Sequence, residues 1–234
     1  GVLHPREDDL VIDASGRLVT PGLVNAHTHI YSALARGIAL KDPPPESFPQ
    51  TLGRLWWRLD RVLTLSDLDL SAQLHGVECL KAGVTSIFDH NSSPGAVGGS
   101  LSTLARALRG LGLRCCLCYE VSDRNGPATA AAGVEENAAF LAATLDDRSG
   151  MVRGLFGLHA SFTLGEETLR ACVEAAGDAG FHLHLEEDRC DAEVTRERFG
   201  CGPVERLRRH GVLGSRTLCV HGVHLTDDEA ALLA

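Results

Sequence analysis

Positive charge, methionine and long apolar runs are all scarce in this 234-residue sequence. The 22 Lys and Arg residues are outnumbered by 31 Asp and Glu, and the formal net charge of −9 argues against nucleic acid or an anionic membrane as the main partner. No apolar run reaches the roughly 18 residues of a membrane-spanning helix, so no membrane partner is expected. With 44% hydrophobic and 23% charged residues, the composition is that of a globular protein with a sizeable core.

Cysteine is not scarce, since the sequence contains eight. Four of them lie in apolar, strand-like runs: Cys115, Cys116, Cys118 and Cys219. A chain of this length does not need disulfides to stabilise it, so we expect reduced, buried thiols in a cytoplasmic protein. The Cys116-x-Cys118 pair is only a weak indication of a metal site, because the usual cysteine zinc motif has a wider spacing.

Strand-like runs alternate with helical stretches along the chain. Six apolar runs with little polar alternation are expected to be strands buried on both faces: residues 18–27, 84–90, 113–119, 152–159, 181–187 and 216–221. Helices are expected between them, at residues 52–82, 100–111, 134–144, 166–179 and 203–210. Glycine precedes four of the strands and is expected to end the helix before each: Gly83, Gly112, Gly180 and Gly211.

Strand–helix units at this spacing predict right-handed crossovers and a parallel α/β sheet. A doubly wound open sheet is the alternative, but no Gly-rich dinucleotide turn follows the first strand. Histidines instead stand at the ends of several strands, and catalytic residues of a (β/α)₈ barrel lie at the carboxyl ends of its strands. We therefore predict a TIM-type (β/α)₈ barrel, with about six βα units present.

Both ends of the sequence suggest that more chain belongs to this protein. The single methionine is Met151, so the sequence does not begin at an initiator residue. Residues 8–18 are expected to be the end of a hairpin with its turn at Ser15-Gly16. Thr226 with Glu229 three residues later predicts a capping box that opens a final helix. We expect a piece of a longer protein, in which residues 1–18 are the edge of a small β-sandwich domain and residues 19–234 are an incomplete barrel.

The first strand ends in His27-Thr28-His29. Residues two apart on a strand point to the same face, so the two imidazoles can bind one metal ion beyond the strand end. Surface histidines in a loop are the alternative for this motif alone. Three more histidines, however, end later strands in the same way: His159, His184 and His221.

Other residues near the strand ends are candidates for supporting roles. Glu187 lies just beyond the fifth strand, where a partly desolvated carboxylate suits proton transfer. His90 is a candidate substrate contact, or alternatively a hydrogen-bonded residue behind the ligands. His182 is expected in the interior layer below His184. Trp56 and Trp57 are expected mainly in core packing, and lining a pocket for a planar heterocycle is the alternative.

Three or four neutral imidazoles favour Zn²⁺, or alternatively Fe²⁺, over Mg²⁺ and Ca²⁺, which prefer oxygen ligands. One such ion lowers the pKa of bound water from ~15.7 towards about 7 and supplies hydroxide at neutral pH. Hydroxide can attack an amidine, a ring C–NH₂ or an amide carbon. Catalysis would need one more carboxylate at the water, and the only candidate found at a strand end is Asp89, low in its strand.

These motifs together resemble the amidohydrolase superfamily. The resemblance rests on residues 21–29, His184 with Glu187, and residues 221–225, and it is strongest to the cytosine-deaminase-like branch, which includes chlorohydrolases and guanine and S-adenosylhomocysteine deaminases. Within that branch, three segments are similar to SsnA-type aminohydrolases: residues 55–60, 88–90 and 157–163.

The resemblance implies a metal-dependent hydrolase barrel that acts on carbon–nitrogen bonds of a small heterocyclic or amidine substrate. It implies His27, His29 and His184 as ligands of a single metal ion, with His221 at the metal or its water. It implies Glu187 as the acid–base residue and His159 as a substrate contact, whereas His90 is a candidate substrate contact from its position alone.

The family's last ligand, an Asp at the end of the eighth strand, has no counterpart because the sequence stops after the sixth. We therefore expect little or no turnover by this chain alone, and the parent protein is expected to be a homodimer. A barrel that binds metal or ligand without catalysis is the alternative.

Overall fold

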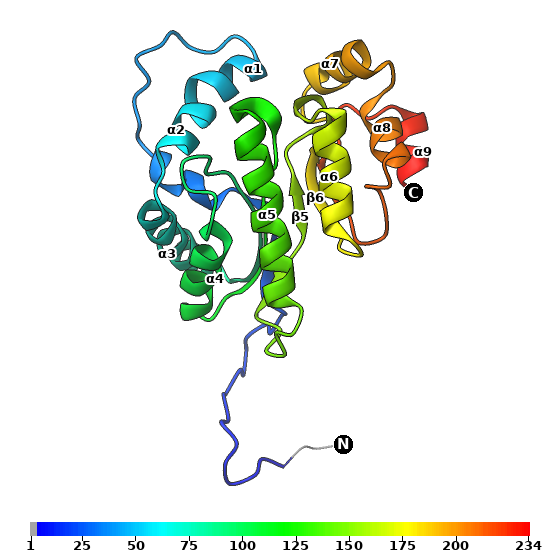
Figure 1. The fold of residues 1–234 in the computed structure, drawn as a ribbon. Helices are drawn as coiled ribbons and strands as arrows, with labels where there is room; N and C mark the ends of the chain where they lie inside the picture. The colour runs from blue at the N-terminus through cyan, green and yellow to red at the C-terminus, as the bar shows by residue number, and fades with distance from the viewer. Residues whose placement is uncertain (1–3) are drawn as a thin grey trace.

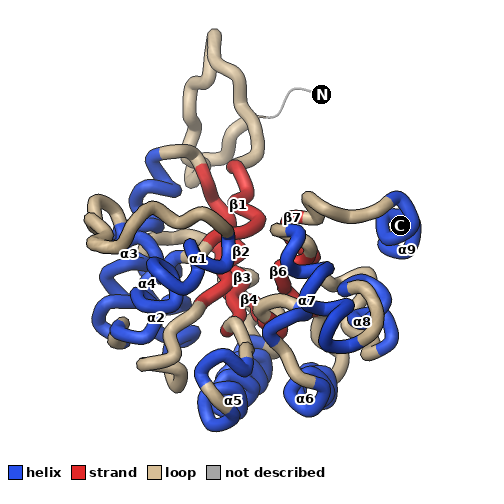
Figure 2. The backbone as a smooth tube through the Cα atoms, turned by 90° about the horizontal axis from the view of Figure 1, so that it is seen from above, coloured by secondary structure: helices blue, strands red, loops and turns tan. Residues whose placement is uncertain are grey.

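The computed structural model describes residues 4–234 as strands surrounded by helices (Figures 1 and 2). A four-stranded sheet has the order β1-β2-β3-β4, and a three-stranded sheet has the order β5-β6-β7. Every neighbouring pair is parallel. The strands are β1 (Leu23–Thr28), β2 (Val84–Asn91), β3 (Arg114–Tyr119), β4 (Val152–Gly154), β5 (Phe156–Leu158), β6 (Phe181–Leu185) and β7 (Leu218–His221). The predicted parallel α/β architecture is therefore confirmed.

The fourth predicted strand is split in two, which corrects the single strand expected at residues 152–159. β4 and β5 are separated by Leu155, whose N–H donates to the carbonyl of Leu117 in β3 at 3.2 Å. Beyond the break, the Val121 N–H donates to the Gly157 carbonyl at 3.3 Å. A Cβ at Gly157 would lie 2.1 Å from the Tyr119 oxygen, so the close approach requires glycine. The two sheets therefore form one curved wall that is joined along this interrupted strand.

The helices follow the predicted alternation, with two corrections. They are α1 (Phe48–Thr51), α2 (Trp57–Val62), α3 (Leu65–Lys81), α4 (Ser100–Gly110), α5 (Pro127–Thr144), α6 (Glu166–Ala176), α7 (Arg189–Phe199), α8 (Pro203–Arg209) and α9 (Asp227–Leu233), with a π-helical turn at Leu52–Trp56. The expected helix 52–82 breaks before Thr64, whose side chain caps α3 in a reciprocal capping box with Asp67. α7 was not predicted, whereas the capping box of α9 at Thr226 and Glu229 is confirmed.

Three of the four glycines expected to end helices adopt the left-handed conformation that favours glycine. Gly83, Gly112 and Gly211 have φ values of 78°, 78° and 73°. The prediction for Gly180 was wrong, because α6 ends at Gly177, with φ 54°. Gly180 instead allows the backbone before β7 to pass close to it. A Cβ at Gly180 would lie 1.9 Å from the Arg216 carbonyl oxygen.

The hydrophobic core lies between the strands and the surrounding helices. Its fully buried members include Leu68 from α3, Leu104 from α4, Ile87 from β2, Leu117 from β3 and Phe156 from β5. Burying one such side chain stabilises the fold by roughly 1.5–3 kcal/mol relative to exposing it. This packing fixes the strands and thus the positions of the residues that follow their carboxyl ends.

Residues 4–22 form no strand and extend away from the body of the molecule (Figure 1). The predicted turn at Ser15-Gly16 is present, with the Arg17 N–H donating to the Ala14 carbonyl at 3.0 Å, but the hairpin strands beside it are not formed. No partner strand in the described residues holds this segment, and Leu18 is 90% exposed. Its assignment to a small β domain stays a prediction. Within residues 4–234, no helix is both long and apolar enough to cross a bilayer.

Candidate metal centre and pocket

Three histidines predicted as ligands meet at the carboxyl end of the strands. His27 comes from the end of β1, His29 from the residue after it, and His184 from β6. Their ring centroids lie 4.8 Å apart for His27 and His29, and 5.1 Å apart for each of the other two pairs. Residues that are 155 positions apart in the sequence are thus brought to one point, as a shared metal site requires.

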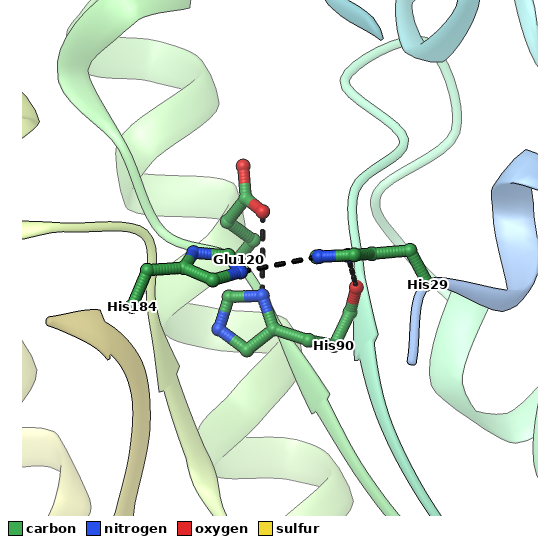
Figure 3. A group of neighbouring side chains, drawn as sticks. All are labelled: His29, His90, Glu120 and His184. Carbon is green, nitrogen blue, oxygen red and sulfur yellow. Dashed lines mark hydrogen bonds and ion pairs between the residues drawn. The ribbon is translucent and has the colours of Figure 1, made fainter. Parts of the chain in front are cut away.

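Hydrogen bonds determine which ring nitrogens of His29 and His184 carry protons. The Nδ1 of His29 donates to the His90 carbonyl at 2.7 Å, and the Nδ1 of His184 donates to the His159 carbonyl at 3.0 Å. In the neutral rings, both Nε2 atoms therefore carry lone pairs. These Nε2 atoms face each other at 3.1 Å (Figure 3).

Two lone pairs at this distance repel unless a positive species lies near both. Two nitrogen ligands of a tetrahedral zinc ion, with bonds of about 2.0–2.1 Å, lie about 3.3 Å apart. The 3.1 Å separation between the Nε2 atoms of His29 and His184 therefore matches a shared divalent cation. The residues present fit the metal that the sequence predicts.

A chain of hydrogen bonds leaves a lone pair on the Nε2 atom of His27 as well. The Cys118 thiol donates to the Asp89 carbonyl at 3.5 Å, so the Nδ1–H of His182 donates to the Cys118 sulfur at 3.6 Å. His182 Nε2 then accepts from His27 Nδ1 at 2.9 Å. The Nε2 of His27 is left with a lone pair and has no hydrogen-bond partner. His182 is 1% exposed, in the interior position predicted for it.

Burial keeps these imidazoles in the neutral form that binds metals. It lowers the pKa of His29 to about 4 and that of His27 to about 3, and the charge of neighbouring histidines adds to the effect in both. The pKa of His184 lies well below its ordinary value for the same reasons. Neutral imidazoles favour Zn²⁺ or Fe²⁺ over Mg²⁺ and Ca²⁺.

Glu120 is a member of the cluster that was not predicted. It follows β3 directly and is 6% exposed. Its Oε2 lies 3.3 Å from His90 Nδ1, and its Oε1 lies 3.5 Å from Arg124 Nη2 and 3.8 Å from His159 Nε2. Burial raises the pKa of Glu120, but His159, His90 and Arg124 outweigh this and hold the pKa well below its ordinary value. The same end-of-strand rule that identified the histidines also applies to Glu120.

His90 lies behind the other imidazoles. It is fully buried, and its Nε2 is 3.1 Å from the carbonyls of both Leu158 and His182. It is not among the residues that line the pocket described next. This position agrees with the alternative stated for His90, a hydrogen-bonded residue behind the ligands, and a substrate contact stays a prediction.

A cavity of about 360 Å³ opens in front of the cluster. Trp56 and Trp57 both line this cavity and are half-buried, which matches the alternative stated for them and not core packing. The Arg124 guanidinium lies 5.3 Å from the Trp57 ring centroid. The other lining residues are His27, Thr28, His29, Tyr31, Ser32, Phe48, Leu52, Glu120, His159, His184, Glu187 and His221.

His159 presents an acceptor to the cavity. The Thr163 hydroxyl donates to the Ala160 carbonyl at 3.0 Å, so the Thr163 oxygen accepts from Nδ1 of His159 at 2.7 Å. The Nε2 of His159 therefore carries the lone pair. Burial lowers the pKa of this ring to about 4 and keeps it neutral.

Glu187 and His221 lie together at the cavity wall, with Glu187 Oε2 3.5 Å from His221 Nε2. Burial raises the pKa of Glu187 to about 7, and the charges of Asp191, Glu120 and Asp188 add to the effect. His221 has a φ of 77°, a strained conformation for a residue other than glycine. This conformation occurs at the turn that ends β7, where the Gly222 N–H donates to the Leu185 carbonyl at 2.8 Å.

A larger cavity, of about 690 Å³, opens at the opposite, amino end of the strands. It is lined by residues such as Ser86, Arg114, Gly180 and Arg216, and none of its lining residues is a histidine. Its size alone does not make it the functional site, because the convergent imidazoles lie at the other end.

Fold and site together define a parallel α/β barrel wall with a histidine cluster that can hold a metal ion at the carboxyl ends of its strands. The sequence profile of the Amidohydrolase family matches residues 18–234, and the chain belongs to that family.

Two relatives show the level of similarity. The 5-methylthioadenosine/S-adenosylhomocysteine deaminase of Desulforudis audaxviator is 32% identical over 230 residues, which cover 97% of this chain and 50% of that protein. The 5'-deoxyadenosine deaminase of Methanothermobacter thermautotrophicus is 31% identical over 234 residues, covering 99% and 52%. The chain spans about half the length of the relatives it matches.

Solved structures support the fold. An adenosine deaminase of Xanthomonas campestris with bound zinc aligns with a TM-score of 0.77 at 24% identity, over 91% of this chain and 46% of that one. The atrazine chlorohydrolase TrzN of Arthrobacter aurescens, complexed with zinc, aligns with a TM-score of 0.74 at 19% identity, over 91% and 51%. The chain thus has the fold of about half of each of these proteins.

Proposed function

We propose that this chain is the metal-binding half of an aminohydrolase that removes an amino group from a planar nitrogen heterocycle by hydrolysis. The observation that carries the proposal is the convergence of His27, His29 and His184, as neutral rings, on one cavity that also contains Glu187 and His221. Relatives named as deaminases of adenosine derivatives support a purine nucleoside as the substrate.

His29 and His184 would hold the metal through their opposed Nε2 atoms, with the free Nε2 of His27 beside them. Zinc in two of the matched structures supports Zn²⁺, and Fe²⁺ is the alternative. When bound, such an ion acts as a Lewis acid that activates water near neutral pH. His221, whose ring centroid lies 5.4 Å from that of His27 and 5.5 Å from that of His184, would bind the metal or orient that water.

The remaining steps fall to side chains of this chain. Glu187 would hold a proton at Oε2 and deliver it to the leaving nitrogen, in keeping with its position at the cavity wall and its raised pKa. His159 Nε2 would accept a hydrogen bond from the substrate. The Trp57 ring would cover one face of a planar heterocycle and exclude water from it.

We also propose that the 234-residue chain alone turns over little substrate. Among the described residues, β1 pairs only with β2, and β7 pairs only with β6. The cavity therefore lacks a wall between these two edge strands, and water enters freely. The parent protein is proposed to be a cytoplasmic homodimer. It is also proposed to be an SsnA-type aminohydrolase, and the likeness of residues 55–60, 88–90 and 157–163 to such proteins supports this subgroup.

Ammonia release tests the proposal. The chain and its parent protein are each incubated with adenosine, 5'-methylthioadenosine, guanine and a hydroxytriazine. The parent should release ammonia from one of them, and Glu187→Gln should reduce the rate by about 10²–10⁴-fold, the contribution of a general acid.

Bound zinc is measured in the same samples and should be unchanged in Glu187→Gln. Glu193→Gln, an exposed carboxylate on α7, is the matched control and should keep the full rate. A Glu187→Gln protein with the wild-type rate would contradict the role of Glu187, and no ammonia from any heterocycle would contradict the proposed function.

A further inference from the structure

Two hydrogen-bond acceptors lie side by side in the wall of the cavity. Glu120 and His159 both line it, and Glu120 Oε1 lies 3.8 Å from His159 Nε2. His159 Nε2 carries a lone pair, because Nδ1 donates to the Thr163 oxygen and burial lowers the pKa of the ring to about 4. The ring therefore has no hydrogen to donate to the carboxylate. These two atoms are called the acceptor pair below.

Arg124 attracts the charge of Glu120 without donating a hydrogen bond to Oε1. Its Nη2 lies 3.5 Å from Oε1, but the two Nη2 hydrogens go to Asp60 and to the Ser92 hydroxyl at 2.7 Å. In Figure 3, one carboxylate oxygen of Glu120 is joined to His90, and the other points away from that ring. Among residues 4–234, Oε1 therefore has no hydrogen-bond donor and is free to accept from a ligand.

The acceptor pair restricts which edge of a ligand can lie against it. A ligand that displaces water from this place must replace the hydrogen bonds of that water, so it has to bring two hydrogens of its own. An edge with acceptors would meet two lone pairs and leave them buried without donors, which is costly. No Lys or Arg side chain lines the cavity in the described part of the chain, so no basic group there would compensate such an edge.

A ring N–H beside an exocyclic amino group presents two hydrogens on one edge, which is called the amidine edge below. Guanine has an amidine edge, whereas adenosine has a ring-nitrogen lone pair next to its amino group. The Trp57 ring lies 6.5 Å from the His159 ring and is inclined to it by 66°. A planar ligand that packs against Trp57 can therefore direct its edge towards the acceptor pair. Hydrogen bonds to the carboxylate are charge-assisted and roughly twice as strong as those between neutral groups.

We propose that Glu120 determines specificity together with His159, by binding the amidine edge of the substrate, and that the cavity therefore selects guanine-type over adenine-type heterocycles. The inference rests on the proposed function in taking this cavity as the substrate site, but it requires neither a metal ion nor turnover. Glu120 then has a role that neither the apolar pattern nor the histidine spacing of the sequence indicates.

Three small ligands separate recognition of the amidine edge from attraction of charge. 2-Aminobenzimidazole has the edge, benzimidazole lacks the amino group, and 1,3-dimethylbenzimidazolium is a cation without any N–H. Binding of each to the metal-free chain is measured by equilibrium dialysis, so that no metal ion contributes to the affinity. Wild type should bind 2-aminobenzimidazole about 10–100-fold more tightly than either of the others, which is the contribution of hydrogen bonds to a charged group.

Two variants of Glu120 test the carboxylate itself. Glu120→Gln removes the charge but keeps one acceptor, and it should weaken the binding of 2-aminobenzimidazole by about 10-fold. Glu120→Asp keeps a negative charge near Arg124 but is shorter by one methylene, which withdraws the carboxylate from His159 and should also reduce the preference. Glu193→Gln, an exposed carboxylate on α7, is the matched control and should bind all three ligands as wild type does. Circular dichroism checks that each variant is folded, and Glu120→Asp carries the test if Glu120→Gln is not.

The outcomes distinguish this inference from the proposed reaction. A wild-type chain that binds the three ligands equally, or binds none of them, would overturn the inference, as would an undiminished preference in the folded Glu120 variants. Binding of 1,3-dimethylbenzimidazolium as tight as that of 2-aminobenzimidazole would also overturn it, because charge alone would then be recognised. A chain that prefers 2-aminobenzimidazole while its parent releases no ammonia from any heterocycle would contradict the proposed reaction alone.

Discussion

Replacing Arg206 with methionine should destabilise the chain strongly. Arg206 lies in α8 and is 2% exposed. Its Nη1 donates to the Ser161 carbonyl at 2.7 Å, and its Nη2 donates to the Leu164 carbonyl at 2.9 Å. The guanidinium also stacks 3.6 Å from the Phe199 ring centroid. One side chain therefore anchors the loop that carries Thr163, the residue that orients His159.

The expected cost follows from the two carbonyls. The Leu164 carbonyl loses its donor, which costs about 1–3 kcal/mol, whereas the Ser161 carbonyl keeps the Leu164 N–H at 3.4 Å and adds at most about 1 kcal/mol, so the expected total is about 1–4 kcal/mol. The ion pair with Glu166 adds little, because the Glu166 side chain is 48% exposed and such pairs contribute about 0–1 kcal/mol. Arg206→Met keeps an unbranched apolar side chain, so the decrease in the free energy of unfolding comes mainly from the lost hydrogen bonds and not from a cavity.

Urea unfolding followed by circular dichroism measures the free energy of unfolding of both proteins. Glu166→Gln is the control, with an expected loss of at most about 1 kcal/mol. An Arg206→Met loss no larger than that of Glu166→Gln would refute the reasoning, because the carbonyls of Ser161 and Leu164 would then not depend on Arg206.

Two further predictions concern the scaffold. The Asp147 carboxylate accepts from the Ser149 hydroxyl at 2.6 Å, and hydrogen bonds lower its pKa from 3.8 to about 2. The stabilisation by the Asp147 carboxylate is therefore fully present above pH 3.8, the pKa in the unfolded chain, and is lost as pH falls towards about 2. The difference in the free energy of unfolding between wild type and Asp147→Asn should therefore shrink over that pH range. A constant difference would contradict this. Gly157→Ala should cost about 1–3 kcal/mol, because its Cβ would meet the Tyr119 oxygen, whereas Gly110→Ala, with open space in α4, should gain up to about 1 kcal/mol. Equal effects in thermal unfolding would contradict the close approach.

The convergence of these histidines was predictable because it follows a simple rule of parallel sheets. His27, His29, His184 and His221 stand at strand ends that the apolar pattern of the sequence reveals. Strand ends of a parallel sheet lie at one edge, so residues far apart in sequence meet there. The prediction needed no knowledge of side-chain contacts.

Other features depended on contacts that the sequence does not display. The break in the fourth strand depends on the approach of Gly157 to Tyr119, which involves residues 38 positions apart. Trp57 lines the cavity just after a π-helical turn, and no local propensity signals that turn. Glu120 lies one residue beyond the expected strand 113–119. Its contact with His90 joins residues 30 positions apart and is visible only in the structure.

The central claim is that imidazoles from distant strands share one divalent cation, and metal analysis tests it most directly. The chain is loaded with Zn²⁺, freed of excess metal, and its zinc content is compared with those of His29→Asn and His184→Asn. One zinc per wild-type chain and none in either variant is the predicted result. A full equivalent of zinc retained by either variant would contradict the shared site.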